Sequence, residues 1–197
     1  TNAAARVGFC DGLIFMKNMG FDMGMADPFT GKTLLCEAAA NSKPEVVRLL
    51  IKWLEHSEVA GVGSGILLVN VPFQFPSDYL NRFDDEEESA AIHYAVEAGC
   101  TQCVDALLSA GADVNLQDCG GHTPVMLACQ IGCLSSVMKI MASGADADVE
   151  NAEGMYAIDL LPDICPESSR VQITDVVWGG MTKVARDNIF EDWMEKW

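Results

Sequence analysis

A period of 33 residues is the feature of this 197-residue chain that most constrains its fold. When residues 85–117 are laid over residues 118–150, about eight positions are identical. The glycines recur where the chain must change direction, and the aliphatic residues recur where a helix must face its neighbour. Six of the matched positions are Ala95 and Ala128, Gly99 and Gly132, Val104 and Val137, and Gly111-Ala112-Asp113 with Gly144-Ala145-Asp146.

Each unit is predicted to contain two short helices. Residues 90–98 form the first, which ends at Gly99 because glycine takes the left-handed conformation that terminates helices. Residues 102–110 form the second, with Val104 and Leu107 on one face. Thr123 and Pro124 then begin the next unit, with proline in the first turn, where its missing N–H is tolerated. Neither helix can bury its apolar side alone, so the units must stack.

These motifs resemble the ankyrin repeat. The family pattern is seen in residues 123–128, between Gly121 and Gly132, and in the second-helix ending at 107–115. It recurs at 31–39, 45–50 and 154–160, and residues 13–22 resemble the back half of another unit. The resemblance covers most of residues 13–161. It implies an all-α solenoid of helix–turn–helix units joined by hairpin loops, with one long insertion and a C-terminal amphipathic helix.

The chain is divided on this basis into seven segments. Thr33 and Ala90 are 57 residues apart rather than a multiple of 33, so about 24 residues are inserted between them. The predicted segments are a partial repeat or cap at 1–30, a repeat at 31–53, an inserted loop or arm at 54–84, repeats at 85–117 and 118–150, a divergent repeat at 151–180, and an amphipathic helix at 181–197.

Two segments outside the repeat pattern are candidates for docking. Residues 61–76 place a glycine-rich stretch before an apolar one that contains Phe73 and Phe75, which predicts a projecting arm. Residues 181–197 repeat apolar side chains at helical spacing and include Trp193 and Trp197. This helix is expected to cap the last repeat, because a terminal unit leaves an apolar edge. The alternative is that its tryptophans anchor a partner.

The charge of the chain restricts its partners. Lys and Arg total 12 against 29 Asp and Glu, a net charge of −17, which disfavours nucleic acid and anionic lipid and favours a basic protein surface. No run approaches the roughly 18–20 apolar residues of a membrane span. Eight cysteines without the spacing of a disulfide framework indicate free thiols in an intracellular compartment, cytoplasmic or nuclear. Residues 1–6 would also suit the stub left in an organelle lumen by a removed targeting peptide, or a piece of a longer chain.

No catalytic, cofactor or metal site is predicted. Gly31-Lys32-Thr33 lacks the glycine that a phosphate loop needs five positions earlier, and it fits a helix start instead. Cys100 and Cys103 form a lone CxxC motif, for which zinc binding and a redox dithiol are the chemical alternatives. In the family, positions 103 and 129 face the stack, which favours core cysteines. The resemblance likewise implies that His93 makes a structural hydrogen bond at a helix start.

The acidic run at residues 84–88 has two interpretations. One is a solvated loop, and the other is a contact surface for a basic partner, since Glu86 and Glu87 fall at a hairpin tip in the ankyrin frame. The resemblance implies binding through hairpin tips and the inner-helix surface. The contact residues that it implies are Phe29, Thr30, Lys32, Asn41, Glu86, Glu87, Ser89, Glu97, Gln117, Cys119, His122, Gln130, Ile131, Glu150, Glu153 and Met155.

The functional hypothesis is a non-catalytic scaffold or adaptor that binds a protein partner. The alternative is a structural subunit of a larger multiprotein complex, anchored by the 61–76 arm (Phe73, Phe75) and the C-terminal helix (Trp193, Trp197). A third hypothesis makes the chain the ankyrin part of an enzyme whose catalytic domain lies outside these residues.

Overall fold

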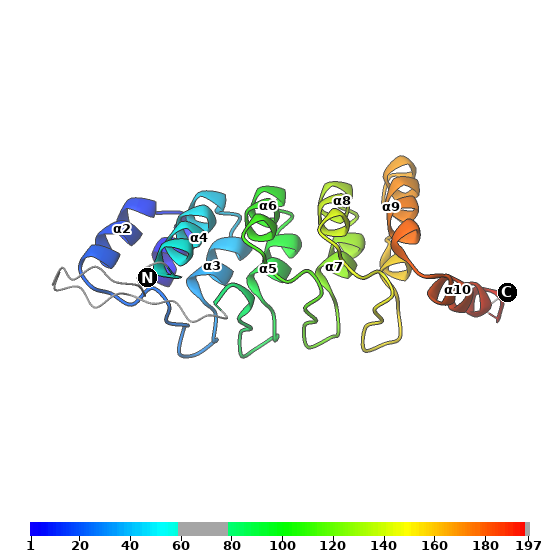
Figure 1. Ribbon diagram of the computed structural model, residues 1–197, viewed down its shortest axis with the longest axis horizontal. Coiled ribbons are helices and arrows are strands. Elements are labelled where there is room, and N and C mark those ends of the chain that lie inside the picture. Colours follow the sequence, from blue (N-terminus) through cyan, green and yellow to red (C-terminus); the bar gives the residue numbers. More distant parts are fainter. Residues whose placement is uncertain (59–78, 196–197) are drawn as a thin grey trace. The chain divides into compact units, whose positions relative to one another are not determined.

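A computed structural model of the chain describes residues 1–58 and 79–195 (Figure 1). Regular structure in these residues is entirely helical, as predicted. The chain divides into two compact units, Thr1–Asp113 and Val114–Trp197. The predicted arm at 61–76, with Phe73 and Phe75, lies outside the described residues, as do Trp197 and the side chain of Trp193.

The first unit contains three helix pairs. They are α1 (Asn2–Val7) with α2 (Cys10–Asn18), α3 (Leu34–Ala40) with α4 (Pro44–Glu58), and α5 (Ala91–Glu97) with α6 (Thr101–Ser109). Helix α3 packs between α1 and α5, and α4 packs between α2 and α6, which makes two parallel rows (Figure 1). Helix α4 buries Val46, Val47 and Leu50 on one face. The apolar face of each pair is therefore covered by the next pair, as the repeat pattern predicts.

The N-terminal segment is more complete than expected. Residues 1–30 were predicted to hold a partial repeat, but α1 and α2 form a full helix pair with Ala5 and Leu13 fully buried. Arg6 of α1 donates two hydrogen bonds to the Glu37 carboxylate of α3, at 3.1 and 3.2 Å. Residues 1–6 are thus part of the packed unit.

The segment predicted as an insertion begins later and ends earlier than residues 54–84. Helix α4 continues to Glu58, past the expected repeat end at residue 53. At the other end, the short helix η2 (Tyr79–Asn81) packs against α5. Tyr79 is buried, and its hydroxyl donates a hydrogen bond to the Met23 carbonyl at 3.2 Å. Residues 79–84 therefore pack against the first unit through Tyr79 and Asp84 and do not form part of a projecting arm.

The helix starts follow the predicted chemistry with one variation. The Thr33 hydroxyl accepts a hydrogen bond from the Cys36 N–H at 3.2 Å and so caps α3. The residue before α5 is Ala90, which has no side-chain acceptor. Its own N–H donates to the His93 Nδ1 at 3.1 Å, and the His93 side chain is fully buried. This confirms the structural role predicted for His93.

The second unit contains α7 (Pro124–Ile131), α8 (Leu134–Ala142), η3 (Ala157–Leu160), α9 (Glu167–Gly180) and α10 (Lys183–Glu195). The short helix η3 packs beside α7, where an inner helix would lie, and α9 packs beside α8. Leu161, the residue that follows η3, has an extended backbone because it precedes Pro162. The divergent repeat predicted at 151–180 thus has a full second helix, α9, whereas its first helix is reduced to the short η3.

The C-terminal helix packs on its own unit through fewer residues than predicted. Ala185 and Ile189 are buried, and the Thr182 N–H donates to the Asp148 carboxylate at 2.8 Å. Phe190 and Met194, which belong to the apolar side chains of the predicted amphipathic helix at 181–197, are 61% and 65% exposed. The apolar side chains of α10 are therefore divided between a buried and an exposed face.

A pair of glycine substitutions separates backbone strain from close packing. Gly31 and Gly111 both have positive φ, 70° and 84°. A Cβ at Gly31 would lie 2.5 Å from the Asp85 Cγ, whereas a Cβ at Gly111 would meet nothing within 4 Å. Gly111→Ala should lower the free energy of unfolding by about 1–2 kcal/mol. Gly31→Ala should lower it by at least ~1 kcal/mol more. Urea unfolding measures both, and equal losses would contradict the packing assigned to Gly31.

Candidate protein-binding surface

Each of the helices α3, α5, α7 and η3 is preceded by a hairpin loop, here called a finger, and the four fingers are numbered in chain order. Each finger is closed by one side-chain oxygen, from Asp27, Asp84, Asp118 or Asn151, that accepts two backbone N–H groups. In the first unit, Asp27 accepts from Phe29 and Thr30 at 2.9 and 3.2 Å, and Asp84 from Ser89 and Glu87 at 2.8 and 3.3 Å. In the second, Asp118 accepts from Gly120 and His122, and Asn151 from Glu153 and Met155, at 2.8–3.0 Å. The fingers are thus folded by internal hydrogen bonds.

Fingers within one unit are also bonded to each other. In the first unit, the Asp85 N–H donates to the Thr30 carbonyl at 3.1 Å. In the second, the Ala152 N–H donates to the Gly120 carbonyl at 3.0 Å. Gln117, which was predicted to contact a partner, donates instead to the carbonyls of Gly121 and Glu150. Each pair of fingers therefore presents its tips in a fixed relation.

The acidic run at 84–88 is divided between structural and exposed residues. Asp84 is buried and accepts a hydrogen bond from the Tyr94 hydroxyl at 2.6 Å. The same hydroxyl lies 3.1 Å from the Glu87 carboxylate. Burial and these two carboxylates raise the pKa of Tyr94 well above its ordinary range. Of the two interpretations of this run, the solvated loop is wrong for Asp84, while Glu86, Glu87 and Glu88 are exposed.

Three of the predicted contact residues are engaged with their own unit. The Lys32 ammonium lies 4.7 Å above the Tyr94 ring and 4.0 Å from the Glu86 carboxylate. Glu87 bonds Tyr94, as described above. Lys32 and Glu87 thus contact Tyr94 of their own unit, and Glu86 lies in a weak exposed pair; partner contact by these three residues stays a prediction.

The other predicted residues fall into two places. Phe29 is at the tip of the first finger and 90% exposed. Glu97 is exposed at the end of α5. Of the rest, Thr30 and Asn41 of the first unit are half-buried, and Ser89 is buried, so the exposed contact position predicted for Ser89 is wrong. In the second unit, His122 and Met155 are half-buried, and the exposed residues are Cys119, Gln130, Ile131, Glu150 and Glu153. The His122 ring lies 3.3 Å from both the Asp118 carboxylate and the Asn151 amide, so it supports its finger. These residues belong to two separately described units and are not treated as one surface.

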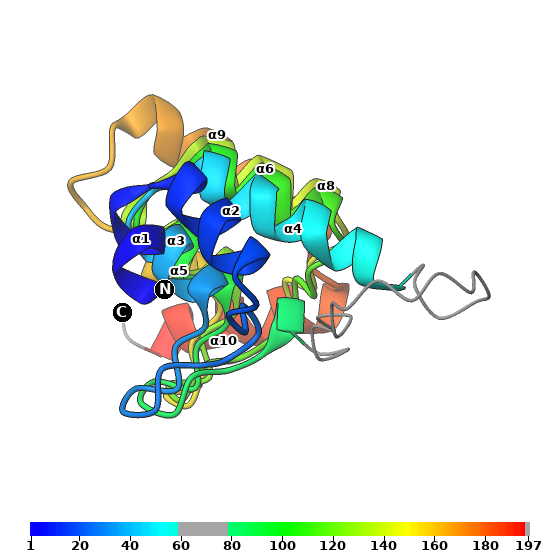
Figure 2. The ribbon, with the colours of Figure 1, turned by 90° about the vertical axis from the view of Figure 1, so that its left-hand side faces the viewer.

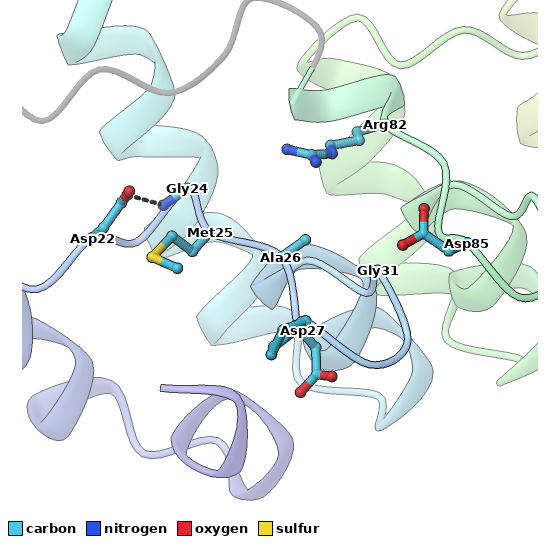
Figure 3. A pocket seen from close by; sticks show the side chains of 9 residues that line it. Asp22, Gly24, Met25, Ala26, Asp27, Gly31, Arg82 and Asp85 are labelled. Atoms are coloured by element: carbon cyan, nitrogen blue, oxygen red, sulfur yellow. Dashed lines mark hydrogen bonds between the residues drawn. The ribbon is translucent and has the colours of Figure 1, made fainter.

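A depression of about 490 Å³ lies beside the first finger (Figure 3). Asp22 and Met25 line it from the segment before the finger, and Arg82 and Asp85 line it from the segment after η2. Asp22 is held by a 2.8 Å hydrogen bond from the Gly24 N–H. We call Asp22, Met25, Phe29, Arg82 and Asp85 the finger surface.

The finger surface is acidic with an apolar edge. Three aspartates and one arginine are among the residues that line the depression, since Asp27 also contributes to it. Hydrogen bonds, first of all the one from the Phe29 N–H, lower the pKa of Asp27 below its ordinary value, so this carboxylate stays charged at neutral pH. Met25 is 62% exposed beside them. The arrangement can bind a cationic side chain in the depression and an apolar one against Phe29 and Met25.

The helix pair α1 and α2, which faces the viewer in Figure 2, carries further exposed apolar side chains. We call Val7, Phe9, Phe15 and Met19 of this segment the end face; each is between 59% and 72% exposed. Terminal units of repeat proteins ordinarily carry a polar outer side. Helix α2 buries Leu13 on one face and exposes the apolar Phe15 on another. A helix with apolar residues on more than one face is typically covered by other parts of a protein.

Sequence reasoning missed most of both surfaces. Phe29 was predicted, but Asp22 and Arg82 are 60 residues apart in the sequence and carry no motif. The signal for the end face was available, because Leu13, Ile14, Phe15 and Met16 leave no polar side on that stretch of helix.

Within residues 1–58 and 79–195, no helix is long and apolar enough to cross a membrane. The same residues contain no group of three or more His, Cys, Asp or Glu side chains placed to hold a metal ion.

A substitution in the acidic run tests the division between its structural and exposed members. Asp84→Ala removes the acceptor of the Ser89 N–H and of the Tyr94 hydroxyl, and it should lower the free energy of unfolding by about 2–4 kcal/mol. Glu88→Gln, at an exposed position of the same loop, should change it by less than about 0.5 kcal/mol. Thermal and urea unfolding of both variants provide the measurement, and equal stabilities would show that Asp84 is dispensable.

Comparison with known proteins agrees with this geometry. A family model of ankyrin repeats, in three copies, matches residues 2–118 and 66–151. No curated protein matches the chain. The matched residues cover far more than half of the sequence and include the three helix pairs of the first unit, α7 with α8, and the fingers that precede α3, α5 and α7. The chain therefore belongs to the ankyrin repeat family.

Proposed function

We propose that this protein binds a basic segment of a protein partner through the finger surface and acts as an adaptor or scaffold. Ankyrin repeats are generally protein–protein interaction modules. The observation that carries the proposal is Phe29, whose side chain is 90% exposed at a finger tip that internal hydrogen bonds hold in place. An aromatic side chain presented on a fixed loop loses little entropy when a partner covers it.

The charges of the depression beside the first finger favour a cationic segment. Asp22 and Asp85 approach the same depression from two parts of the chain, and the whole protein carries a net charge of −17. Opposite charge on the partner would speed encounter, and a lysine or arginine in the depression would select orientation. Arg82 lines the same depression as these carboxylates and would attract an acidic group of the partner. A partner segment in which basic and acidic residues alternate therefore fits better than a single cationic group.

Lys32 and Glu87 are better explained as supports. Their contacts with Tyr94 join the first finger to α5, and the removal of either would loosen the surface without removing a contact to the partner. Glu88 has no such role and remains available for recognition, since it is exposed in the second finger. The recognition residues are therefore those of the finger surface together with Glu88.

Single substitutions in the finger surface test the proposal. Phe29→Ala should weaken binding to the partner by about 30-fold, as for an interface hot spot. Asp85→Lys should slow association and make its rate less sensitive to salt. Partners are recovered from extract of the native source on the immobilised chain and are then purified for kinetics. Phe190→Ala, at an exposed aromatic of α10, serves as the matched control.

The proposal requires that the control and wild type bind alike. If Phe29→Ala and Asp85→Lys both leave affinity and association rate unchanged, the finger surface is not the binding site.

A second function, that of a subunit in a larger assembly, is favoured by the end face. Its four apolar side chains are each more than half exposed, and water solvates such side chains poorly. Residues 1–26 contain two basic residues, Arg6 and Lys17, and two acidic ones, Asp11 and Asp22, so this region is neutral in a strongly acidic chain. An apolar, neutral surface suits a permanent contact, because charge repulsion does not oppose it. The anchors first expected, the 61–76 arm and Trp193 and Trp197, remain hypotheses.

Light scattering of the purified chain distinguishes the two functions. A subunit that lacks its partner should associate with rising concentration, and Phe15→Ser with Met19→Ser should return it to a monomer. Val184→Ser, which removes an exposed apolar residue of α10, should have no such effect. A wild-type chain that stays monomeric at all concentrations would remove the support for the subunit function and leave the adaptor.

A further inference from the structure

Two cysteines meet at the first turn of α6. Cys100 is the residue that precedes the helix, and Cys103 is in its third position. The Cys103 N–H donates a hydrogen bond to the Cys100 Sγ at 3.3 Å. After burial, the Cys100 thiol is the neighbour that most raises the pKa of Cys103. The start of the helix therefore holds the two cysteine side chains near each other.

The two thiols differ in access to solvent. Cys100 is half-buried, whereas Cys103 is fully buried among the apolar residues of the helix pair. Burial, and then the neighbouring Cys100 thiol, raises the pKa of Cys103, so its thiol stays protonated at neutral pH. A reagent in solution would therefore meet Cys100 first, and Cys103 would be protected from every reaction except one with its neighbour.

The chain contains a matched site that lacks the second thiol. In the other unit, Cys133 precedes α8 as Cys100 precedes α6, and the third helical position is Ser136. The Cys133 Sγ lies 3.3 Å from the Ser136 Oγ. The geometry is thus repeated, but a hydroxyl cannot form a disulfide. The pair of thiols at α6 is a property of one repeat and not of the repeat pattern.

We infer that Cys100 and Cys103 are a redox site that forms a reversible disulfide by exchange with a low-molecular-weight disulfide such as oxidised glutathione. Burial of Cys103, which favoured a core role from the sequence alone, is compatible with this chemistry, because the exposed partner starts the reaction. Metal binding by the pair is less well supported, since two sulfur atoms are half of a tetrahedral zinc site and the described residues supply no third ligand.

The exchange proceeds in two balanced steps. The Cys100 sulfur, having lost its proton, attacks one sulfur of the small disulfide; an S–S bond forms to Cys100, and a small thiolate leaves. The Cys103 sulfur then attacks the Cys100 sulfur of the mixed disulfide, and the second small thiolate leaves. The proton of Cys103 passes to that departing thiolate. The protein loses two hydrogen atoms, and the small disulfide is reduced to two thiols.

The site is tested in mixtures of reduced and oxidised glutathione. The folded full chain is equilibrated, quenched with acid, alkylated and analysed by peptide mass spectrometry. We expect the peptide with Cys100 and Cys103 to lose two hydrogens without bound glutathione, and dithiothreitol to reverse this. The exposed Cys119 provides an internal reference for simple glutathione addition. Glutathione addition at Cys119 with no disulfide at 100–103 would overturn the inference.

Two variants exchange the arrangements at α6 and α8, so the inference can still be tested if one of the variants fails to fold. Cys103→Ser gives α6 the arrangement of α8, and Cys100 should then stop at the mixed disulfide with glutathione. Ser136→Cys gives α8 the arrangement of α6 and should add a second disulfide between residues 133 and 136. Circular dichroism confirms that each variant is folded. A Cys103→Ser chain in which Cys100 takes up no glutathione would also overturn the inference, because the first step requires that reaction.

Discussion

The burial of each helix pair by the next is the constraint on which the structure depends. No pair in the chain can cover its own apolar face, because helices such as α3 and α5 are seven residues long. Contacts are therefore made between neighbours, and each unit is a short row with two ends. One consequence is that every end must be covered by something else. In the second unit α10 contributes Ala185 and Ile189 to burial, and in the first unit the end face is left exposed.

The sequence predicted the parts of the fold that depend on local chemistry. Gly99 and Gly132 end helices with positive φ, Thr33 caps a helix, and Cys103 and Cys129 are buried. These outcomes follow from the backbone or from the repeat position of one residue. Helix α1 was missed because its sequence, from Asn2 to Val7, carries no repeat motif, and its place is decided by packing and by the Arg6–Glu37 pair.

The candidate site was harder to predict because it depends on contacts between distant segments. Asp84 and Glu88 are alike in a sequence, and only the position of Tyr94 distinguishes the buried acceptor from the exposed charge. Asp22 and Arg82 meet at one depression because η2 returns the chain to the first finger after the insertion. In α10, the separation of Ile189 from Phe190 depends on how bonds to Asp148 and Tyr156 orient the helix.

The closure of each finger by its own Asp or Asn has a consequence for how such a protein can evolve. Since the loop conformation rests on Asp27 and backbone groups, the identity of the side chain at Phe29 contributes little to folding. Mutations at the tip are therefore nearly neutral for stability, while they alter which molecules the surface accepts. New binding preferences can accumulate at such a position without compensating changes in the helices, and a copy of the gene could change partners within a few substitutions.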